Sequence, residues 1–242
     1  NDQLLITDNM AFKISNPETT SQNNDARHPC FDKEAKGKFG RVHLPIAPKC
    51  NIQCNYCNRD YDCVNESRPG VTSNLLSPLQ AIEYMKDLTS AYENISVAGI
   101  AGPGDAFAQP EVVLETLRGM KAELPNLIPC LSTNGLDAFP YIDELEELGV
   151  KHITLTINAI DIDVLEKIYS WVRFEKRMYR GRMAAEVLHE RQMAALREFG
   201  SRNFVVKVNT VVIPGINDHE IEAVARVAAE CGAEVMNLIP IK

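Results

Sequence analysis

The chain has 242 residues, of which 45% are hydrophobic, enough to form one folded unit with a sizeable core. Its formal net charge of −8 and its lack of long lysine or arginine runs argue against nucleic acid as a partner. It contains no run of eighteen apolar residues and no charged and apolar leader, so we expect neither membrane insertion nor export. Seven cysteines without disulfide-scaffold spacing indicate reduced thiols and a cytoplasmic location.

Two regions are expected along the chain. Residues 1–40 show no clear periodicity and predict an irregular N-terminal extension that carries Cys30, whereas residues 41–242 predict a single domain. Because the chain does not begin with methionine, we expect it to be part of a longer polypeptide.

Strand-like and helix-like segments alternate after this extension. The runs that predict strands are 42–47, 95–101, 128–133, 152–158, 204–213 and 234–241. The segments that predict helices are 78–89, 110–123, 140–148, 183–199 and 218–230. Repeated βα alternation is typical of a parallel sheet, and the chain is too short for eight such units after its first forty residues. We therefore predict an α/β fold, a partial (β/α)6 TIM-like barrel.

Several predicted helices carry boundary signals. Ser77 followed by Pro78 predicts an N-cap with proline in the first helical position. Gly149, Gly200 and Gly232 each follow a helical run, where a left-handed residue commonly ends the helix.

One face of each predicted strand is unexpectedly polar. Parallel strands covered on both sides should be apolar throughout, and side chains alternate between the faces with a period of two. The polar face predicts a lumen that holds solvent or a ligand. Its candidate cofactor contacts are Ser132, Asn134, Thr156, Asn158 and Asn209. For each of them a hydrogen-bonded structural network is an equal alternative.

Three cysteines follow the first predicted strand with the spacing C-x3-C-x2-C. Cys50, Cys54 and Cys57 can supply three thiolates to a 4Fe-4S cluster and leave one iron without a protein ligand. Zinc is the alternative, but structural zinc sites use four ligands, and the chain has no second C-x2-C or H-x3-H pair. The spacing therefore favours an enzyme with an open iron.

This loop, with Tyr56 before its last cysteine, resembles the radical S-adenosylmethionine (SAM) superfamily. The resemblance implies an incomplete TIM-like barrel in which SAM binds the open iron and is cleaved to a 5'-deoxyadenosyl radical. It also implies that Tyr56 lies near the adenine. The segment Gly102, Gly104 and Asp105 would meet the methionine amino group of SAM, although a glycine-rich turn alone is a weak signal.

Longer sequence segments indicate one family within this superfamily. Segments 28–31 (HPCF), 49–63 (KCNIQCNYCNRDYDC), 65–70 (NESRPG) and 102–105 (GPGD) resemble the NifB family of nitrogenase cofactor maturases. The resemblance implies an enzyme that fuses two 4Fe-4S clusters with a SAM-derived carbide into an eight-iron precursor of the nitrogenase cofactor. Its expected partners are iron-sulfur cluster donors and the carrier or scaffold proteins that accept the product.

Further site residues come from the same resemblance. His43, Cys63 and Cys130 would bind one auxiliary 4Fe-4S cluster, and Cys30 would serve a second. Without the resemblance, a buried structural thiol is the favoured interpretation of each of these cysteines, and a hydrogen-bonded core histidine that of His43. Glu66 and Arg68 would manage protons or polar groups of SAM, with a surface ion pair as the alternative.

Other functions remain open at this stage. The family carries a further C-x2-C pair beyond the sixth strand, and this chain lacks it, so the presence of the second auxiliary cluster is undecided. A radical SAM enzyme with auxiliary clusters that modifies peptides is one alternative. A non-enzymatic iron-sulfur carrier or scaffold is another.

Overall fold

A computed structural model describes residues 10–14, 27–32, 34–65 and 74–241, and its main sheet has six parallel strands. In spatial order these are β2 (Gly40–Leu44), β4 (Ile95–Ile100), β5 (Ile128–Thr133), β6 (His152–Thr156), β9 (Val205–Val212) and β10 (Val235–Pro240). The short strand β1 (Met10–Lys13) pairs antiparallel with β10, inside the extension expected to be irregular. The predicted partial (β/α)6 barrel is confirmed.

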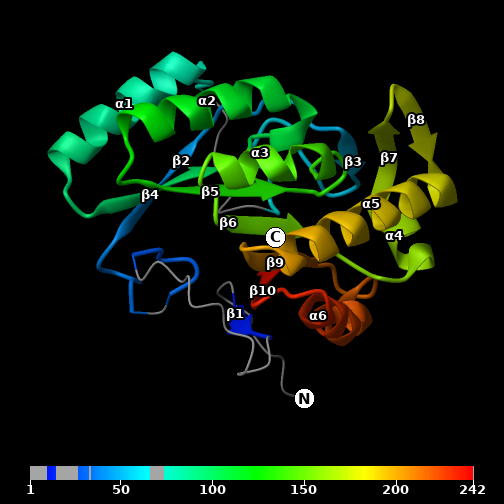
Figure 1. Cartoon of the computed structure of the whole chain (residues 1–242). Coiled ribbons are helices and arrows are strands. Elements are labelled where there is room, and N and C mark those ends of the chain that lie inside the picture. The colour runs from blue at the N-terminus through cyan, green and yellow to red at the C-terminus, as the bar shows by residue number, and fades with distance from the viewer. Residues whose placement is uncertain (1–9, 15–26, 33, 66–73, 242) are drawn as a thin grey trace.

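Helices connect the parallel strands and cover the outer side of the sheet (Figure 1). They are α1 (Pro78–Ala91), α2 (Pro110–Glu123), α3 (Ile142–Glu147), α4 (Ile162–Ile168), α5 (Gly181–Ser201) and α6 (Ile221–Glu230). Short 3-10 turns at η2 (Ala106–Ala108), η3 (Phe139–Tyr141) and η4 (Asp218–Glu220) precede α2, α3 and α6. The sequence predicted all of these helices except α4. None of the helices among the described residues has the length and apolarity needed to cross a bilayer.

The two faces of the sheet differ as the alternation of side chains predicts. Aliphatic side chains on the outer face pack against the helices in the main core, among them Leu44, Ile100, Leu131, Ile153, Val206 and Met236. The intervening positions hold buried polar side chains, among them Ser132, Thr154, Thr156, Lys207 and Asn209. A polar lumen, predicted from the sequence, is therefore present.

The helix boundaries agree with the expected signals at all but one position. Ser77 caps α1. Its hydroxyl accepts a hydrogen bond from the backbone amide of Gln80, and the side-chain oxygen of Gln80 accepts one from the backbone amide of Ser77. Gly149 and Gly232 have φ values of 82° and 91°. Gly200 was expected to end a helix but lies inside α5, where an added Cβ would sit 1.8 Å from the Cys231 carbonyl oxygen. That glycine permits close backbone packing and does not end the helix.

The amino end of the lumen is closed by the segment just before β2. His28 is fully buried, and its ring lies 4.4 Å from the His152 ring of β6, centroid to centroid. Phe31 lies beside both rings, and the Lys207 ammonium lies 4.9 Å from the Phe31 centroid. These contacts fill the space between the amino ends of β6 and β9 and the segment before β2.

A second, three-stranded antiparallel sheet was not predicted. Strand β3 (Ile52–Cys54) lies within the cysteine loop and pairs with β7 (Tyr169–Phe174), which pairs in turn with β8 (Arg177–Arg180). Between β7 and β8 the chain turns at Glu175 and Lys176, which have φ values of 49° and 64°. Two left-handed central residues fit a two-residue hairpin. This sheet ties the cysteine loop to the region between α4 and α5 (Figure 1).

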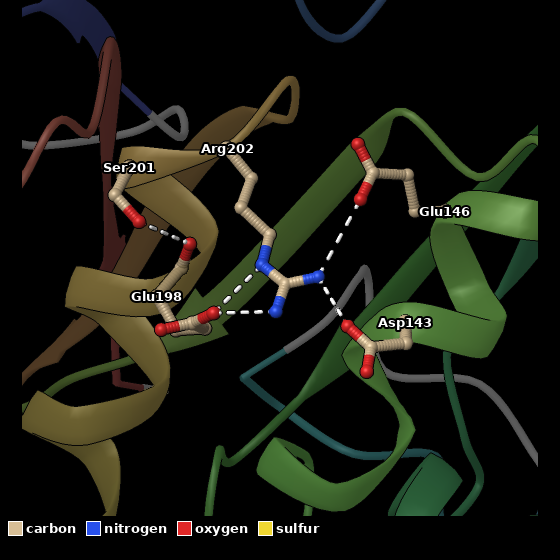
Figure 2. A network of polar contacts seen from close by, with 5 residues as sticks. All are labelled: Asp143, Glu146, Glu198, Ser201 and Arg202. Carbon is tan, nitrogen blue, oxygen red and sulfur yellow. Dashed lines mark hydrogen bonds and ion pairs between the residues drawn. The ribbon is translucent and has the colours of Figure 1, made fainter.

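A surface network fixes the end of α5 against α3 (Figure 2). Arg202 pairs with Glu198 of its own helix and with Asp143 and Glu146 of α3. These carboxylates raise the pKa of Arg202, with the Asp143 contact the largest cause. Ser201 donates to the Glu198 carbonyl oxygen. Because water screens such exposed pairs, we expect the network to contribute little to the free energy of unfolding and mainly to orient α5 against α3.

Candidate functional site

A pocket opens at the carboxyl ends of β4, β5 and β6. Its volume, including the space open to solvent at its mouth, is about 440 Å³. Side chains and backbone from the cysteine loop and from the strand ends form its walls. They include Cys50, Cys54, Cys57, Cys63, Tyr56, Asn65, Gly104, Asp105, Asn134 and Thr156. The structure thus collects the three motif cysteines and most of the predicted cofactor contacts in one place.

The cysteine loop is held by main-chain pairing on one side. Cys54 ends β3 and pairs with Tyr169 of β7, while the Cys57 amide donates to the Cys54 carbonyl oxygen over 3.0 Å. The Gln53 side chain donates to the carbonyl oxygens of both Cys54 and Cys57, over 3.1 and 3.3 Å. These bonds hold the loop in one conformation.

The surroundings of the thiols suit a metal cluster. Burial raises the pKa of the Cys50 thiol to about 11 and that of Cys54 to about 12. Two amide groups nevertheless point at the sulfurs: Asn134 Nδ2 lies 3.8 Å from Cys50 Sγ, and Asn65 Nδ2 lies 4.0 Å from Cys54 Sγ. Buried thiolates need a positive partner, which iron supplies, and amide donors to the sulfurs tune such clusters. The three cysteines therefore fit a 4Fe-4S cluster.

A single metal ion fits these residues less well. Among the described residues, no three His, Cys, Asp or Glu side chains are grouped closely enough to bind one ion. A 4Fe-4S cluster offers a separate iron to each thiolate, so its ligands stand farther apart than those of one zinc ion. The arrangement favours the cluster over the zinc alternative.

The glycine-rich loop after β4 supports the cysteine loop directly. The Gly104 amide donates to the Ala47 carbonyl oxygen over 2.6 Å, and the Asp105 amide donates to the Lys49 carbonyl oxygen over 2.7 Å. A Cβ at Gly104 would lie 2.0 Å from the Lys49 carbonyl oxygen. Gly102 has a φ of 116°, and its carbonyl oxygen accepts a hydrogen bond from the Ala47 amide. These glycines permit close contact with the chain just before Cys50.

Asp105 joins the same loop to the end of β5. Its buried carboxylate accepts from the amides of Asn134 and Phe107, over 2.6 and 3.0 Å, and from the Thr133 hydroxyl over 3.1 Å. Burial raises the pKa of this carboxyl to about 6, against the opposing effect of the three donors. Its oxygens are directed at protein donors, so its contribution is to hold the pocket wall.

A buried network of asparagines and tyrosines adjoins the pocket through Tyr56 and Asn65, which line it, and we call this network the pocket floor. The Tyr56 hydroxyl donates to Asn65 Oδ1 over 2.5 Å and accepts from Asn158 Nδ2 over 2.8 Å. Asn158 also donates to the Tyr169 hydroxyl over 3.1 Å, and its Oδ1 accepts from the Val211 amide over 2.9 Å. The predicted contacts Tyr56 and Asn158 therefore bond to each other in this structure.

Of the other predicted strand residues, Thr156 lines the pocket, whereas Asn209 and Ser132 are buried outside its lining. Asn209 Nδ2 donates to the Asn65 carbonyl oxygen over 2.6 Å. Thr156 lines the pocket, and its buried hydroxyl oxygen has no hydrogen-bond partner among the described residues. Buried polar atoms normally have a partner, so Thr156 is the strand residue best placed to bond a ligand. Ser132 is buried one level deeper in the lumen, two residues before Asn134.

Replacing Asn158 by alanine should destabilise the fold by about 3 kcal/mol. The change leaves the Val211 amide and two tyrosine hydroxyls without this partner in a buried place. Chemical denaturation of the purified variant measures the loss. The control is Asn55→Ala, because exposed Asn55 bonds the Lys167 carbonyl oxygen where water can replace it. A loss at Asn158 no larger than that at Asn55 would contradict a structural role for the network.

The residues expected to bind auxiliary clusters lie deeper in the lumen. His43 of β2 and Cys130 of β5 both pair in register with Gly99 of β4, so they lie on the same face of the sheet. The His43 ring approaches Gly99, and its Nε2 is buried without a hydrogen-bond partner among the described residues. Burial and the nearby charges of Arg41 and Lys207 lower the pKa of His43 to about 3, so the ring is neutral.

The other predicted cluster ligands, Cys30 and Cys63, lie at two different depths in the lumen. Cys30 packs against the apolar cluster that contains Cys130, at the closed end of the lumen. Cys63 instead lines the pocket with the motif cysteines. Cys130 precedes Asn134 by four residues, which is about 13 Å along a strand. The ligand roles of these residues stay predictions. Glu66 and Arg68 lie outside the described residues.

Several residues of the site were not predicted. Asn65 touches Cys54 and Tyr56, and Asn51 bridges Asn134 to Asp137 through its side chain. Gln192 of α5 donates to the carbonyl oxygens of Asn134 and Thr156, over 3.0 and 2.7 Å. Asn51 and Asn65 carried a sequence signal, because they lie within the segments 49–63 and 65–70. The others depend on contacts between distant parts of the chain.

Comparison with known proteins agrees with this geometry. The family model of the radical SAM superfamily matches residues 44–228. The chain belongs to the radical SAM superfamily. Membership implies a 4Fe-4S cluster and SAM.

Within that class, the chain is similar to the FeMo cofactor biosynthesis protein NifB. It is 54% identical to NifB of Chlorobaculum tepidum over 217 residues, which are 90% of this chain and 51% of that protein. It is 44% identical to NifB of Klebsiella pneumoniae over 216 residues, 89% of this chain and 46% of that protein. The resemblance to NifB is thus confirmed, and the chain spans about half the length of the curated relatives it matches.

Solved structures confirm the fold alone. The crystal structure of Streptococcus suis SuiB superposes with a TM-score of 0.55 at 14% identity, covering 81% of this chain and 38% of SuiB. Native anSMEcpe with bound AdoMet gives a TM-score of 0.50 at 14% identity, covering 84% of this chain and 51% of that one. At such identities the likeness says nothing about substrate.

Proposed function

We propose that this chain is the radical SAM part of a nitrogenase cofactor maturase. The observation that carries the proposal is the pocket itself, which three cysteines line together with Asn134 and with Thr156, whose hydroxyl has no partner in the described part of the chain. A cluster there, with one iron left open, would supply the electron that cleaves SAM to a 5'-deoxyadenosyl radical. The similarity to NifB supports the choice of pathway.

The residues of the chain have distinct tasks in this proposal. Cys50, Cys54 and Cys57 hold the cluster, and the amides of Asn134 and Asn65 stabilise negative charge on two of the sulfurs. Thr156 offers a hydroxyl to the polar part of SAM. The buried walls exclude water from the radical, which would otherwise be lost to side reactions.

Tyr56, Ser132, Asn158 and Asn209 are proposed to act through the pocket floor. In this structure Tyr56 and Asn158 bond each other, so they would orient the floor on which SAM rests. Gly102, Gly104 and Asp105 keep the cysteine loop in place from the other side. The methionine amino group of SAM would meet the backbone of this loop, as the family resemblance implies.

The finer reaction is proposed from the resemblance to NifB. Two auxiliary 4Fe-4S clusters would be fused, with a SAM-derived carbide, into an eight-iron precursor. Glu66 and Arg68 would assist with protons or with polar groups of SAM. Iron-sulfur cluster donors and an accepting carrier or scaffold protein would be the partners, in the cytoplasm. The rest of the full-length polypeptide would complete the ligand set of the second cluster.

The depth of the lumen supports a second site below the SAM pocket. His43 and Cys130 flank Gly99 on one face of the sheet, at the level below, and the Nε2 atom of His43 is buried without a partner among the described residues. We propose that these two residues, with Cys63, bind one auxiliary cluster and that Cys30 serves the other. A neutral imidazole is a weaker anchor than a thiolate, which would suit a cluster that must later be released.

Replacing His43 by alanine should lower the iron content of the anaerobically reconstituted full-length protein by up to four atoms per chain. Cleavage of SAM should continue, because the three motif cysteines are unchanged. Iron analysis and quantification of 5'-deoxyadenosine give the two values. The matched control is His219→Ala, an exposed histidine far along the chain that should keep all its iron. Unchanged iron in the His43 variant would rule out the ligand role.

The function itself is tested by product analysis. Full-length, cluster-loaded protein is given dithionite and SAM without oxygen, and 5'-deoxyadenosine and an eight-iron product are measured. Formation of both supports the maturase. Formation of 5'-deoxyadenosine without the eight-iron product would favour another radical SAM enzyme, such as a peptide-modifying one. If neither forms on protein replete in clusters, an iron-sulfur carrier is the better description.

A further inference from the structure

The second sheet has one apolar face and one face directed at solvent. Ile52, Val172 and Tyr179 share the inner face and pack in the core beneath it. The alternate positions lie on the other face, since directly paired residues of antiparallel strands share a face. These positions are Gln53 of β3, Trp171 and Arg173 of β7, and Met178 and Arg180 of β8. We call them the hairpin face.

The composition of the hairpin face is typical of a protein interface. Arg173 and Arg180 are exposed, and Met178 is 44% exposed. Trp171, the only tryptophan of the chain, is half-buried between them. Tryptophan, methionine and arginine are enriched in interfaces, and tryptophan and arginine often dominate their energetics.

The charge of this region is opposite to that of the whole chain. The hairpin from Tyr169 to Arg180 carries four cations, at positions 173, 176, 177 and 180, against one carboxylate, Glu175. The formal net charge of the chain is −8. None of the ion pairs found between described residues involves any of these four cations. Their field is therefore available to attract an acidic surface.

The hairpin face is connected to the cysteine loop by direct bonds. The Gln53 side chain, on this face, donates to the carbonyl oxygens of Cys54 and Cys57. Arg59 completes the connection by donating to Gln53 Oε1, over 3.1 and 3.2 Å, and to the Ile52 carbonyl oxygen over 2.6 Å. Strand β8 lies two strand spacings from β3, which is about 10 Å. A protein docked here would sit next to the loop.

We propose that the hairpin face docks a small acidic protein that carries a low-potential one-electron centre and reduces the cluster of the cysteine loop. The inference rests on the proposed function, because it assumes a cluster that must be reduced before each SAM cleavage. The transfer is a single electron: a donor [4Fe-4S]+ centre becomes [4Fe-4S]2+, and the cluster of this chain goes from 2+ to +. No proton moves and no bond is formed. Charged edge strands also guard against aggregation, and that role alone predicts no specific docking.

Charge reversal tests the docking surface. The variant Arg173→Glu/Arg180→Glu is compared with Lys151→Glu/Arg226→Glu, which reverses two exposed cations away from the hairpin and changes the net charge equally. The probe is an acidic ferredoxin, and the protein is full-length and cluster-loaded. Calorimetry gives the Kd at low salt, and stopped-flow absorbance gives the rate of cluster reduction by the reduced ferredoxin. Dithionite with SAM measures 5'-deoxyadenosine formation without the ferredoxin.

The docking proposal expects the hairpin variant to raise the Kd and lower the reduction rate about tenfold or more, while the control changes either by less than about twofold. Formation of 5'-deoxyadenosine with dithionite should match the wild type in both variants. Equal Kd values in the two variants would overturn the proposal. A wild-type Kd that does not increase as salt is raised would also overturn it, because salt screens the attraction between exposed charges.

Two further outcomes have their own tests. If the double variant loses iron, the single variant Arg180→Gln on the edge strand β8 replaces it, with Arg226→Gln as its control, and a Kd raised at least threefold is then required. If the wild type forms no 5'-deoxyadenosine with dithionite, the proposed function fails. The comparison of Kd values still decides whether the hairpin face binds the acidic protein.

Discussion

Replacing Cys57 by alanine is expected to abolish SAM cleavage, lowering the rate of 5'-deoxyadenosine formation by at least about a thousandfold. The cluster would lose one of its three thiolates, and no other described side chain is placed to replace it except Cys63, which lines the same pocket. Cys57 is only half-buried, so its removal should leave the fold intact. The assay is anaerobic single-turnover chemistry with dithionite, followed by iron analysis of the same sample.

The control for this change is Cys231→Ala. Cys231 is also half-buried, but it follows α6 and packs at the edge of the main core, away from the pocket. Its removal should leave both the iron content and the rate of SAM cleavage near the wild-type values. Retention of iron and of cleavage in the Cys57 variant would show that the cluster is bound elsewhere. The double variant Cys57→Ala/Cys63→Ala tests whether the fourth cysteine substitutes.

Replacing Gly104 by alanine is expected to destabilise the fold by about 3 kcal/mol and to reduce the iron bound at the cysteine loop. The new Cβ would lie 2.0 Å from the Lys49 carbonyl oxygen and 2.9 Å from that of Ala47. Both are backbone atoms and cannot rotate away, so the chain just before Cys50 must move. Denaturation in urea measures the stability, and the iron content after anaerobic reconstitution measures the effect on the site.

Gly119→Ala is the matched control. A Cβ at Gly119 would lie 2.1 Å from Ile82 Cδ1, which is the far end of a flexible side chain. The isoleucine can change its rotamer, and alanine in the middle of α2 gains helix propensity of up to about 1 kcal/mol. We expect a change within about 1 kcal/mol and full iron content. Similar losses in both variants would show that the Gly104 contact has no special part in holding the cysteine loop.

Much of the barrel could be predicted from local patterns. Alternating strands and helices, the cap at Ser77 and the polar face of the lumen are set by residues close together in the sequence. The three-cysteine spacing predicted the cluster loop, and the pocket around it collects Asn134, Thr156 and Asp105, as expected. These features follow from side-chain period and from the rule that parallel strands end at one edge.

The second sheet could not be predicted in the same way. The cysteine loop is irregular in sequence, and its strand β3 forms only because β7, more than a hundred residues later, pairs with it. The hairpin itself alternates polar and apolar residues, which is a strand signal. Its turn, however, consists of Glu175 and Lys176 and not of the asparagine and glycine that normally mark a two-residue turn.

The contacts between the predicted site residues could not be predicted from the sequence either. The Tyr56 hydroxyl bonds Asn65 and Asn158, and the Gly104 amide donates to the Ala47 carbonyl oxygen. The sequence predicted none of these bonds, and the expected contacts of Tyr56 and Gly104 with SAM stay predictions. Sequence spacing indicates which residues share a face, while partners across the lumen depend on how strands from distant parts of the chain come together.

The most direct test concerns the open iron of the cysteine loop. Cluster-loaded protein is reduced without oxygen, and its electron paramagnetic resonance spectrum is recorded before and after SAM is added. If Cys50, Cys54 and Cys57 hold three irons and leave the fourth free, the signal of the [4Fe-4S]+ cluster should change as SAM binds to that iron. A spectrum unaltered by saturating SAM, or a cluster with four protein ligands, would contradict the account.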